Sequence, residues 1–180
     1  MRQIGLKALV IMIFLMGGAS VAAAYATIGQ PAPPLTATEL DGHEFDLAAE
    51  RGKVVIVNFW ATWCSPCRKE MPALDAFYKR YHPDGLEMIG LSADSPHADV
   101  VKVMKSLSYP VAMLDDAKIN GFGTPDQIPT TWVIGRDGVV RAEFTPDKLE
   151  VTEKSLAETI LPLLGKNASA PAHTSPAGNP

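Results

Sequence analysis

One apolar run, followed within three residues by a pair of cysteines, constrains the fold of this chain more than any other feature. The run is KVVIVNFWA, residues 53–61, and the cysteines are Cys64 and Cys67. A continuous apolar run of this length is typical of a strand that is buried on both faces of a parallel or mixed sheet. The cysteines therefore follow the end of a buried strand.

The segment after the cysteines has the pattern of an amphipathic helix. Its apolar residues recur at spacings of three and four: Met71, Leu74, Phe77, Tyr78 and Tyr81. This predicts a helix over residues 65–81, kinked at Pro72, with Cys64 at its N-terminus. Unpaired N–H groups and the helix dipole lower the pKa of a thiol at that position. Cys67 lies on the same helix face, so we expect Cys64 as the exposed attacking thiol and Cys67 as the shielded resolving thiol.

Two cysteines this close together have other common uses. A structural disulfide here would stabilise the fold little, because the stabilisation grows with the length of the closed loop. A structural zinc site normally takes four ligands, and the chain's four histidines show no paired ligand spacing. We therefore expect no metal and no cofactor. A copper site made of both cysteines and one histidine remains the metal-binding alternative.

The rest of the chain predicts an α/β domain with a central mixed sheet flanked by helices. The expected elements are an N-terminal hairpin of strands 35–40 and 43–47 around a type I′ turn at Asp41-Gly42, a strand at 86–93, a helix at 96–107, a short strand at 111–116, an irregular segment at 117–129, a hairpin of strands 130–135 and 139–145, and a helix at 147–164. The strand-helix-strand order implies parallel pairing.

Both ends of the 180-residue sequence differ from the middle. Residues 1–26 combine a basic start, an apolar run and an Ala-Tyr-Ala site, which predicts a signal peptide cleaved before Thr27. The alternative is an uncleaved membrane anchor, although such a span needs about 20 apolar residues. Residues 27–165 form the expected domain, and residues 166–180 form a Pro/Ala/Ser tail expected to be disordered.

The net charge of the chain and its expected export limit the kinds of molecule that it can bind. The net charge is −4, and removal of residues 1–26 would take away two basic residues and no acidic ones. An acidic protein is a poor candidate for binding nucleic acid. We expect a periplasmic or otherwise exported protein, with membrane contact only through the N-terminal segment if that segment is not cleaved.

The segment NFWATWCSPCRKEMP, residues 58–72, resembles the active-site segment of the thioredoxin superfamily. In its fuller form it is similar to the exported TlpA/ResA/DsbE-like thiol-disulfide oxidoreductases, and the resemblance covers residues 32–164. It implies a thioredoxin fold with an N-terminal hairpin, and thiol-disulfide exchange in which Cys64 attacks and Cys67 resolves the mixed disulfide. The implied partners are thiols and disulfides of exported proteins such as apocytochrome c, with a membrane thiol reductase as electron donor.

The resemblance also assigns a substrate-binding surface. The family carries a cis-proline that faces the disulfide, and Ile128-Pro129-Thr130 matches it, although a trans proline at a strand start is also common. Trp63 is expected on the same functional surface. The segment 122–128 looks longer than the matching family loop, and its role is open.

Two polar residues near the cysteines carry a further implication of the resemblance. Asn58 stands where many thioredoxins have an aspartate that handles the proton of the resolving cysteine. Glu70 matches a glutamate that lies near the cysteines in ResA-like members, and it is three residues beyond Cys67. It is therefore a candidate proton acceptor, or else an exposed glutamate favoured by the helix N-terminus.

Two other functions remain as alternatives. One is a copper-handling protein for oxidase assembly. The other is a thiol peroxidase of related fold, for which Thr62 is misplaced relative to the expected threonine.

Overall fold

The computed structural model describes residues 26–94 and 97–166. The predicted signal peptide and the predicted tail lie outside these residues, except for Ala26 and Lys166, and both stay predictions. Within the described ranges, no helix combines the length and the apolar character needed to cross a bilayer.

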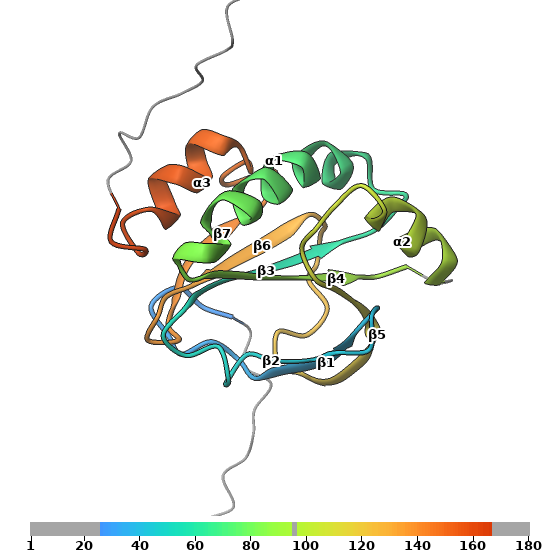
Figure 1. Cartoon of the computed structure of the whole chain (residues 1–180), viewed down its shortest axis with the longest axis horizontal. Helices are drawn as coiled ribbons and strands as arrows, with labels where there is room; N and C mark the ends of the chain where they lie inside the picture. The colour runs from blue at the N-terminus through green and yellow to red at the C-terminus, as the bar shows by residue number, and fades with distance from the viewer. Residues whose placement is uncertain (1–25, 95–96, 167–180) are drawn as a thin grey trace, which may run out of the picture.

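In the described part of the chain, seven strands form one sheet, and three α-helices and one short 3-10 helix complete the fold (Figure 1). The strands are β1 Leu35–Glu39, β2 Glu44–Asp46, β3 Val54–Trp60, β4 Leu86–Ser92, β5 Val111–Asn120, β6 Thr130–Ile134 and β7 Val140–Phe144. The helices are α1 Ser65–Tyr81, η1 His82–Asp84, α2 His97–Met104 and α3 Glu153–Ile160. The strand order is β2-β1-β5-β4-β3-β6-β7.

The buried strand β3 lies inside the sheet and confirms the first expectation from the sequence. All seven of its residues are buried, and it pairs in parallel with β4 and antiparallel with β6. Its side chains alternate between two hydrophobic clusters. Ile56 and Trp60 belong to the cluster that includes both cysteines and the buried face of α1, while Val57 and Phe59 belong to the other.

The two faces of the sheet are covered differently. Figure 1 shows α1 and α3 over one face, while the β1–β2 hairpin curls beneath the other. The hairpin joins the sheet through β5, whose far end pairs with β1 at Leu35↔Asn120. The expected mixed sheet with flanking helices and an N-terminal hairpin is confirmed.

The predicted type I′ turn at Asp41-Gly42 is wrong. A type I′ turn needs a positive φ at both central residues, and of the two only Gly42 has one, at 92°. The turn instead closes through a hydrogen bond from the Gly42 N–H to the Glu39 carbonyl at 2.9 Å. Gly42 is thus the fourth residue of the turn, where a left-handed glycine starts a bulge that restores strand pairing.

Several element boundaries also differ from the predicted ones, including the end of α3 at Ile160 instead of residue 164. Strand β5 continues to Asn120, four residues beyond the predicted end, because its second half pairs with β1 across the sheet. Helix α2 ends at Met104 instead of residue 107. Helix α3 begins at Glu153 instead of residue 147, because Thr152 caps it by accepting a hydrogen bond from the Ser155 N–H.

Candidate active site

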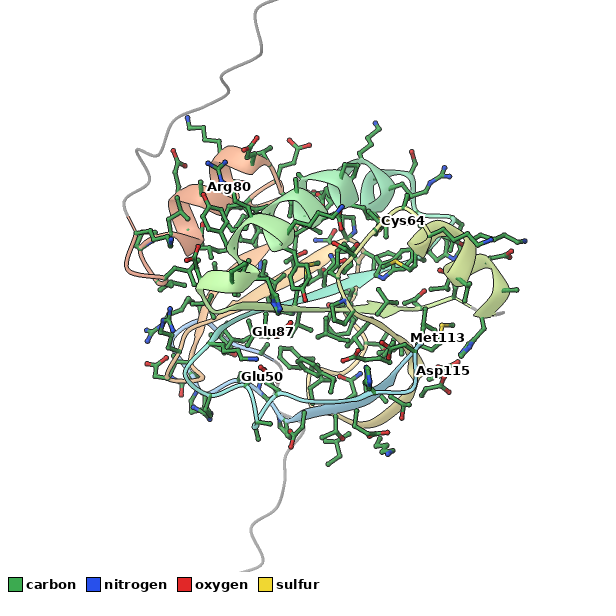
Figure 2. The ribbon with its side chains drawn as sticks, in the orientation of Figure 1. Glu50, Cys64, Arg80, Glu87, Met113 and Asp115 are labelled. Atoms are coloured by element: carbon green, nitrogen blue, oxygen red, sulfur yellow. A yellow bond between two sulfur atoms is a disulfide. The ribbon has the colours of Figure 1, made fainter. Side chains whose placement is uncertain are left out.

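The two cysteines are joined in a disulfide at the start of α1. Cys64 is the N-cap residue in an extended conformation, with φ −77° and ψ 102°, and its Sγ accepts a hydrogen bond from the Cys67 N–H at 3.2 Å. Pro66 occupies the first turn, where its missing N–H leaves no helical hydrogen bond unmade. Figure 2 places Cys64 at the end of α1 that lies nearest α2. The predicted position of the pair at a helix N-terminus is confirmed.

The expected exposure of Cys64 is wrong for this disulfide form. Cys64 is 5% exposed and Cys67 is 2% exposed, so both are buried. The reason is that the Cys64 side chain turns back over the helix start to bond with Cys67. Trp63, directly before it, is 70% exposed. The indole ring of Trp63 is therefore exposed directly before the buried disulfide, and its role on a functional surface stays a prediction.

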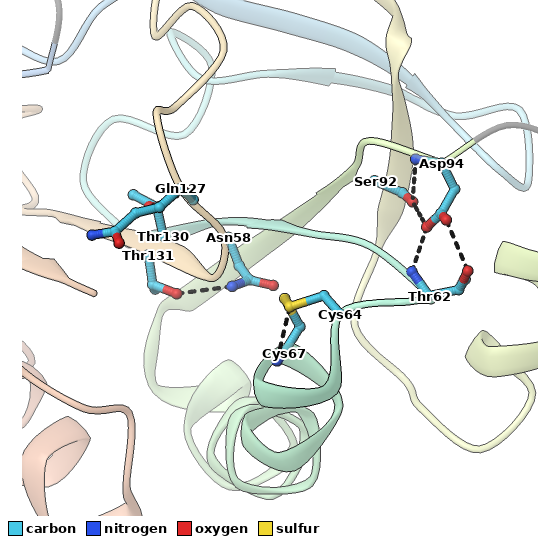
Figure 3. Close-up of a disulfide and its surroundings, with 9 residues drawn as sticks. All are labelled: Asn58, Thr62, Cys64, Cys67, Ser92, Asp94, Gln127, Thr130 and Thr131. Carbon is cyan, nitrogen blue, oxygen red and sulfur yellow. Dashed lines mark hydrogen bonds between the residues drawn. A yellow bond between two sulfur atoms is a disulfide. The ribbon is translucent and has the colours of Figure 1, made fainter. Parts of the chain in front are cut away.

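Asn58 is a buried residue of β3 and lies beside the disulfide (Figure 3). Its Nδ2 donates a hydrogen bond to Oγ1 of Thr131 at 2.8 Å, which fixes the amide from the neighbouring strand β6. Its Oδ1 is buried and has no hydrogen-bond partner within the described residues. Figure 3 shows this oxygen turned toward the disulfide. A thiol formed there on reduction would face a free acceptor, although an amide takes up no proton.

Glu70 is buried on α1, one turn beyond Cys67, and this rules out an ordinary exposed glutamate. It is 8% exposed, and its Oε2 has no partner within the part of the chain that the structure describes. Burial raises the pKa of Glu70 to about 7. The Val151 N–H bonds to the carboxyl and opposes this rise, whereas the nearby Glu150 carboxylate adds to it. Glu70 can therefore gain or lose a proton near neutral pH.

The predicted cis peptide bond between Ile128 and Pro129 is present. It leads directly into β6, which pairs with β3 beside the cysteines through Asn58↔Thr131. Ile128 packs against both hydrophobic clusters, and the cysteines belong to one of them. The hydroxyl of Thr130 donates to the Gln127 carbonyl at 2.7 Å and closes the turn before the strand.

The long segment before Ile128 is anchored on the opposite face of the sheet from the disulfide. Phe122 is buried, and its ring centroid lies 6.2 Å from that of Phe59. Thr124, Asp126 and Gln127 line one side of a cavity there, whose floor includes both rings. This segment thus packs away from the cysteines, and only its end at Ile128 reaches their side.

Sequence reasoning missed Asp94, a buried carboxylate that holds the turn before Cys64. Its Oδ2 accepts from the Thr62 N–H at 2.5 Å, and its Oδ1 accepts from the Thr62 hydroxyl at 2.8 Å (Figure 3). A signal was available, because Asp94 follows β4 almost directly. The carboxyl ends of the parallel strands β3 and β4 meet at one edge of the sheet, which brings the segments after them together.

Potential metal ligands gather elsewhere. Within residues 26–94 and 97–166, one group of three has ligand atoms within 4.8 Å of one another, namely Glu39, Asp41 and His43. It lies at the N-terminal hairpin and does not include Cys64 or Cys67.

The site therefore combines a disulfide at a helix N-terminus, a buried strand before it and a cis-proline at the start of β6. Residues 28–143 match the AhpC/TSA family. The chain belongs to this family.

Within the AhpC/TSA family, the chain is 39% identical over 129 residues to the thiol-disulfide oxidoreductase ResA of Bacillus cereus, covering 68% of this chain and 75% of that protein. It is 34% identical over 118 residues to the thioredoxin-like protein YneN of Bacillus subtilis, covering 63% of this chain and 68% of that protein. These similarities and the Cys64–Cys67 pair establish the chain as a thioredoxin-like thiol-disulfide oxidoreductase.

Solved structures confirm the thioredoxin fold. A thiol:disulfide interchange protein of the thioredoxin family from Chlorobium tepidum is 30% identical, with a TM-score of 0.62, and the match covers 76% of this chain and 99% of that one. A secreted thiol-disulfide isomerase from Corynebacterium glutamicum is 27% identical, with a TM-score of 0.64, and the match covers 74% of this chain and 85% of that one.

Proposed function

We propose that this oxidoreductase reduces disulfides of exported proteins, with the haem-site cysteines of apocytochrome c as the first substrate to test. The observation that carries the proposal is the Cys64–Cys67 disulfide at the start of α1, with the buried carboxyl of Glu70 one turn beyond it and no partner for its Oε2 among the described residues. A pair of thiols at a helix N-terminus supplies the nucleophile, and a carboxyl with a pKa near 7 supplies a proton acceptor.

The reaction consists of two exchange steps. In the reduced protein, the Cys64 thiolate attacks one sulfur of the substrate disulfide, and the other substrate sulfur leaves as a thiolate. Cys67 then loses its proton and attacks the sulfur of Cys64, so the second substrate sulfur leaves. Two electrons have passed to the substrate, and the Cys64–Cys67 disulfide remains. A membrane thiol reductase is the proposed donor that reduces this disulfide again.

Glu70 is proposed to take the proton that Cys67 must lose in the second step, directly or through a water molecule. Asn58 cannot do so, because an amide is not a base in this pH range. A carboxyl with a pKa near 7 is partly ionised at neutral pH and can accept a proton there.

The proposed docking surface consists of Trp63 and the turn Ile128-Pro129-Thr130. Trp63 offers a large exposed aromatic ring next to Cys64. The turn leads into β6 beside the redox pair, which suits it to present main-chain groups to an extended substrate segment.

Export to the periplasm or an equivalent compartment is part of the proposal. It is supported by the pattern of residues 1–26 and by the likeness to the secreted isomerase from Corynebacterium glutamicum. Mass spectrometry of the protein from its host should find an N-terminus at Thr27 or Tyr25. An intact Met1 in the membrane fraction would contradict cleavage.

Trapping tests the proposed substrate. Cys67→Ala should accumulate a mixed disulfide with a peptide that carries an oxidised Cys-x-x-Cys-His site, and dithiothreitol should release it. Cys64→Ala is the matched control and should trap nothing. If Cys67→Ala traps a peptide with unrelated sequence around its disulfide equally well, the preference for haem-site cysteines is wrong. Turnover by Cys67→Ala at the wild-type rate would contradict the resolving role.

A further inference from the structure

The turn between β3 and α1 carries both Trp63 and Cys64. The Cys64 N–H closes it by bonding to the Ala61 carbonyl at 3.1 Å. That bond lies within the turn and does not determine how the turn sits on the rest of the molecule. Thr62 links the turn to a distant segment, because its N–H and its hydroxyl both donate to Asp94, 32 residues away in sequence.

Asp94 is buried and makes a further hydrogen bond. It is 8% exposed, and its Oδ2 also accepts from the hydroxyl of the buried Ser92 at 2.9 Å. The preceding residue joins the two strand ends, because the Ala93 N–H bonds to the Trp60 carbonyl at 2.9 Å. The carboxylate thus has three neutral donors, and among the described residues no basic side chain pairs with it.

We propose that Asp94 is a positioning residue of the exchange reaction: by holding Thr62, it fixes the turn that presents Cys64 to a protein disulfide. Attack on a disulfide requires the three sulfur atoms to approach a line, so the placement of the first sulfur controls the rate with a bulky substrate. A small alkylating reagent approaches from any open direction and has no such requirement.

The molecule contains a matched control for this arrangement. Asp75 on α1 is 6% exposed and accepts from the Ser108 N–H at 2.6 Å and from the Ser108 hydroxyl at 2.8 Å. Like Asp94, it accepts from the backbone N–H and the hydroxyl of one residue, although both bonds reach its Oδ1 and its Oδ2 pairs with Lys79 at 2.6 Å. Asp75 lies eight residues beyond Cys67, about 12 Å along the helix at 1.5 Å per residue. Its loss should lower stability without touching the turn.

The experiment isolates the first attack in a Cys67→Ala background. Two rates are measured for the reduced protein: formation of the mixed disulfide with an oxidised dicysteine peptide, by stopped flow, and alkylation by iodoacetamide. We expect Asp94→Ala to slow the exchange by about ten- to hundredfold, in line with the cost of misplacing a reacting atom. Alkylation should change by less than about threefold, since that reagent needs no fixed approach.

Two further substitutions complete the design. Asp94→Asn should recover exchange to within about threefold of the parent, because its oxygen can accept from the Thr62 N–H and its amide can donate to the hydroxyl. Asp75→Ala should change neither rate by more than about twofold, although it loses comparable hydrogen bonds and stability. If Asp94→Ala fails to fold, Thr62→Val replaces it, with Thr62→Ser as the conservative partner that keeps the hydroxyl.

The outcomes separate this inference from the function on which it rests. If the parent protein does not react with the peptide at all, the exchange function itself fails. If it reacts and Asp94→Ala behaves as Asp75→Ala does, the positioning role is wrong. It is also wrong if alkylation slows as much as exchange, because Asp94 would then act on the ionisation of the thiol instead of its placement.

Discussion

Two buried carboxyl groups belong to the segments around the redox pair, and they differ in how many hydrogen bonds they accept. Asp94, on the side of Cys64, accepts three hydrogen bonds from Thr62 and Ser92. Glu70, on the side of Cys67, has a main-chain contact with Val151, and one of its oxygens is buried without a partner in the described structure. Both residues are 8% exposed, so the difference lies in hydrogen bonding and not in burial.

The number of hydrogen-bond donors around a buried carboxyl group determines what that group can do. A buried carboxylate with enough donors is stable as an anion and resists movement, which suits it to hold a turn in place. A buried carboxyl with too few donors favours its neutral form, and its pKa rises toward the pH at which the protein works. The first arrangement suits the proposed positioning role of Asp94, and the second suits the proposed proton transfer by Glu70, although both are buried acidic residues.

The largest expected effect that tests this contrast is kinetic and concerns Glu70. Glu70→Gln keeps the shape of the side chain but removes the proton acceptor, so resolution of the mixed disulfide by Cys67 should slow by about tenfold to a hundredfold at pH 7.5. The first attack by Cys64 should change little, since the helix N-terminus supports that thiolate. Stopped-flow measurement of both steps across pH checks this. Superimposable resolution profiles for variant and wild type would leave water as the proton acceptor.

The second effect is the contribution of the hydrogen-bonded Asp94 carboxylate to the stability of the fold. Asp94→Ala removes the acceptor of a partly buried N–H and two hydroxyls, and should lower the free energy of unfolding by about 1–3 kcal/mol. Urea denaturation of the oxidised protein at pH 7 measures it, with Asp75→Ala as the comparison. A loss within experimental error would mean that water replaces the carboxylate at no cost and that the turn is not held.

The third effect is a gain in stability on substitution, and its size depends on pH. The pKa of Glu70 is about 7 in the folded protein and 4.5 as the reference value, so the folded state binds more protons between these values. Stability should therefore fall as pH rises from about 4.5 to 7, and Glu70→Gln should lack this loss. We expect the variant to be more stable than wild type by roughly 1–3 kcal/mol at pH 8 and to lose that advantage at pH 4.5. An equal difference at both pH values would contradict the raised pKa.

The smallest effect concerns the charge beside Glu70. The Glu150 carboxylate helps to raise the pKa of Glu70, although less than burial does. Glu150→Gln should therefore lower that pKa slightly, because it removes one partly screened charge interaction. NMR titration of the Glu70 carboxyl carbon measures the shift. A rise after this substitution would show that Glu150 acts through the Val151 contact and not through its charge.

The turn type and the ends of some elements could not be predicted from the local sequence pattern. The Asp41-Gly42 pair correctly marked a hairpin, but its turn type depends on which residue takes a positive φ, and pairing of the flanking strands decides that. The pattern also placed the second half of β5 in an irregular segment. Its alternation is weak, and what makes it a strand is a partner, β1, that lies more than seventy residues earlier in the chain.

Sequence by itself determined the elements around the redox pair. An unbroken apolar run specifies a strand buried on both faces, and three- and four-residue spacing specifies a helix, because each is a repeat of the local backbone geometry. Together they place Cys64 at a helix N-terminus. The Trp-Cys-Ser-Pro-Cys motif then indicated exchange chemistry, and the resemblance to the thioredoxin superfamily indicated the cis bond at Ile128-Pro129 that the structure contains.

Only the tertiary structure decided how the polar groups around the cysteines divide their roles. The partner of Asn58 is Thr131, 73 residues away, and the partner of Asp94 is Thr62, 32 residues away. Neither pairing has a local signature, because each is set by which strands lie side by side and in what register. The raised pKa of Glu70 depends in the same way on everything that excludes water from it. The residue type determines which protons and hydrogen bonds a side chain can offer. Its neighbours from distant parts of the sequence determine whether its hydrogen bonds are all made or whether the group is free to react.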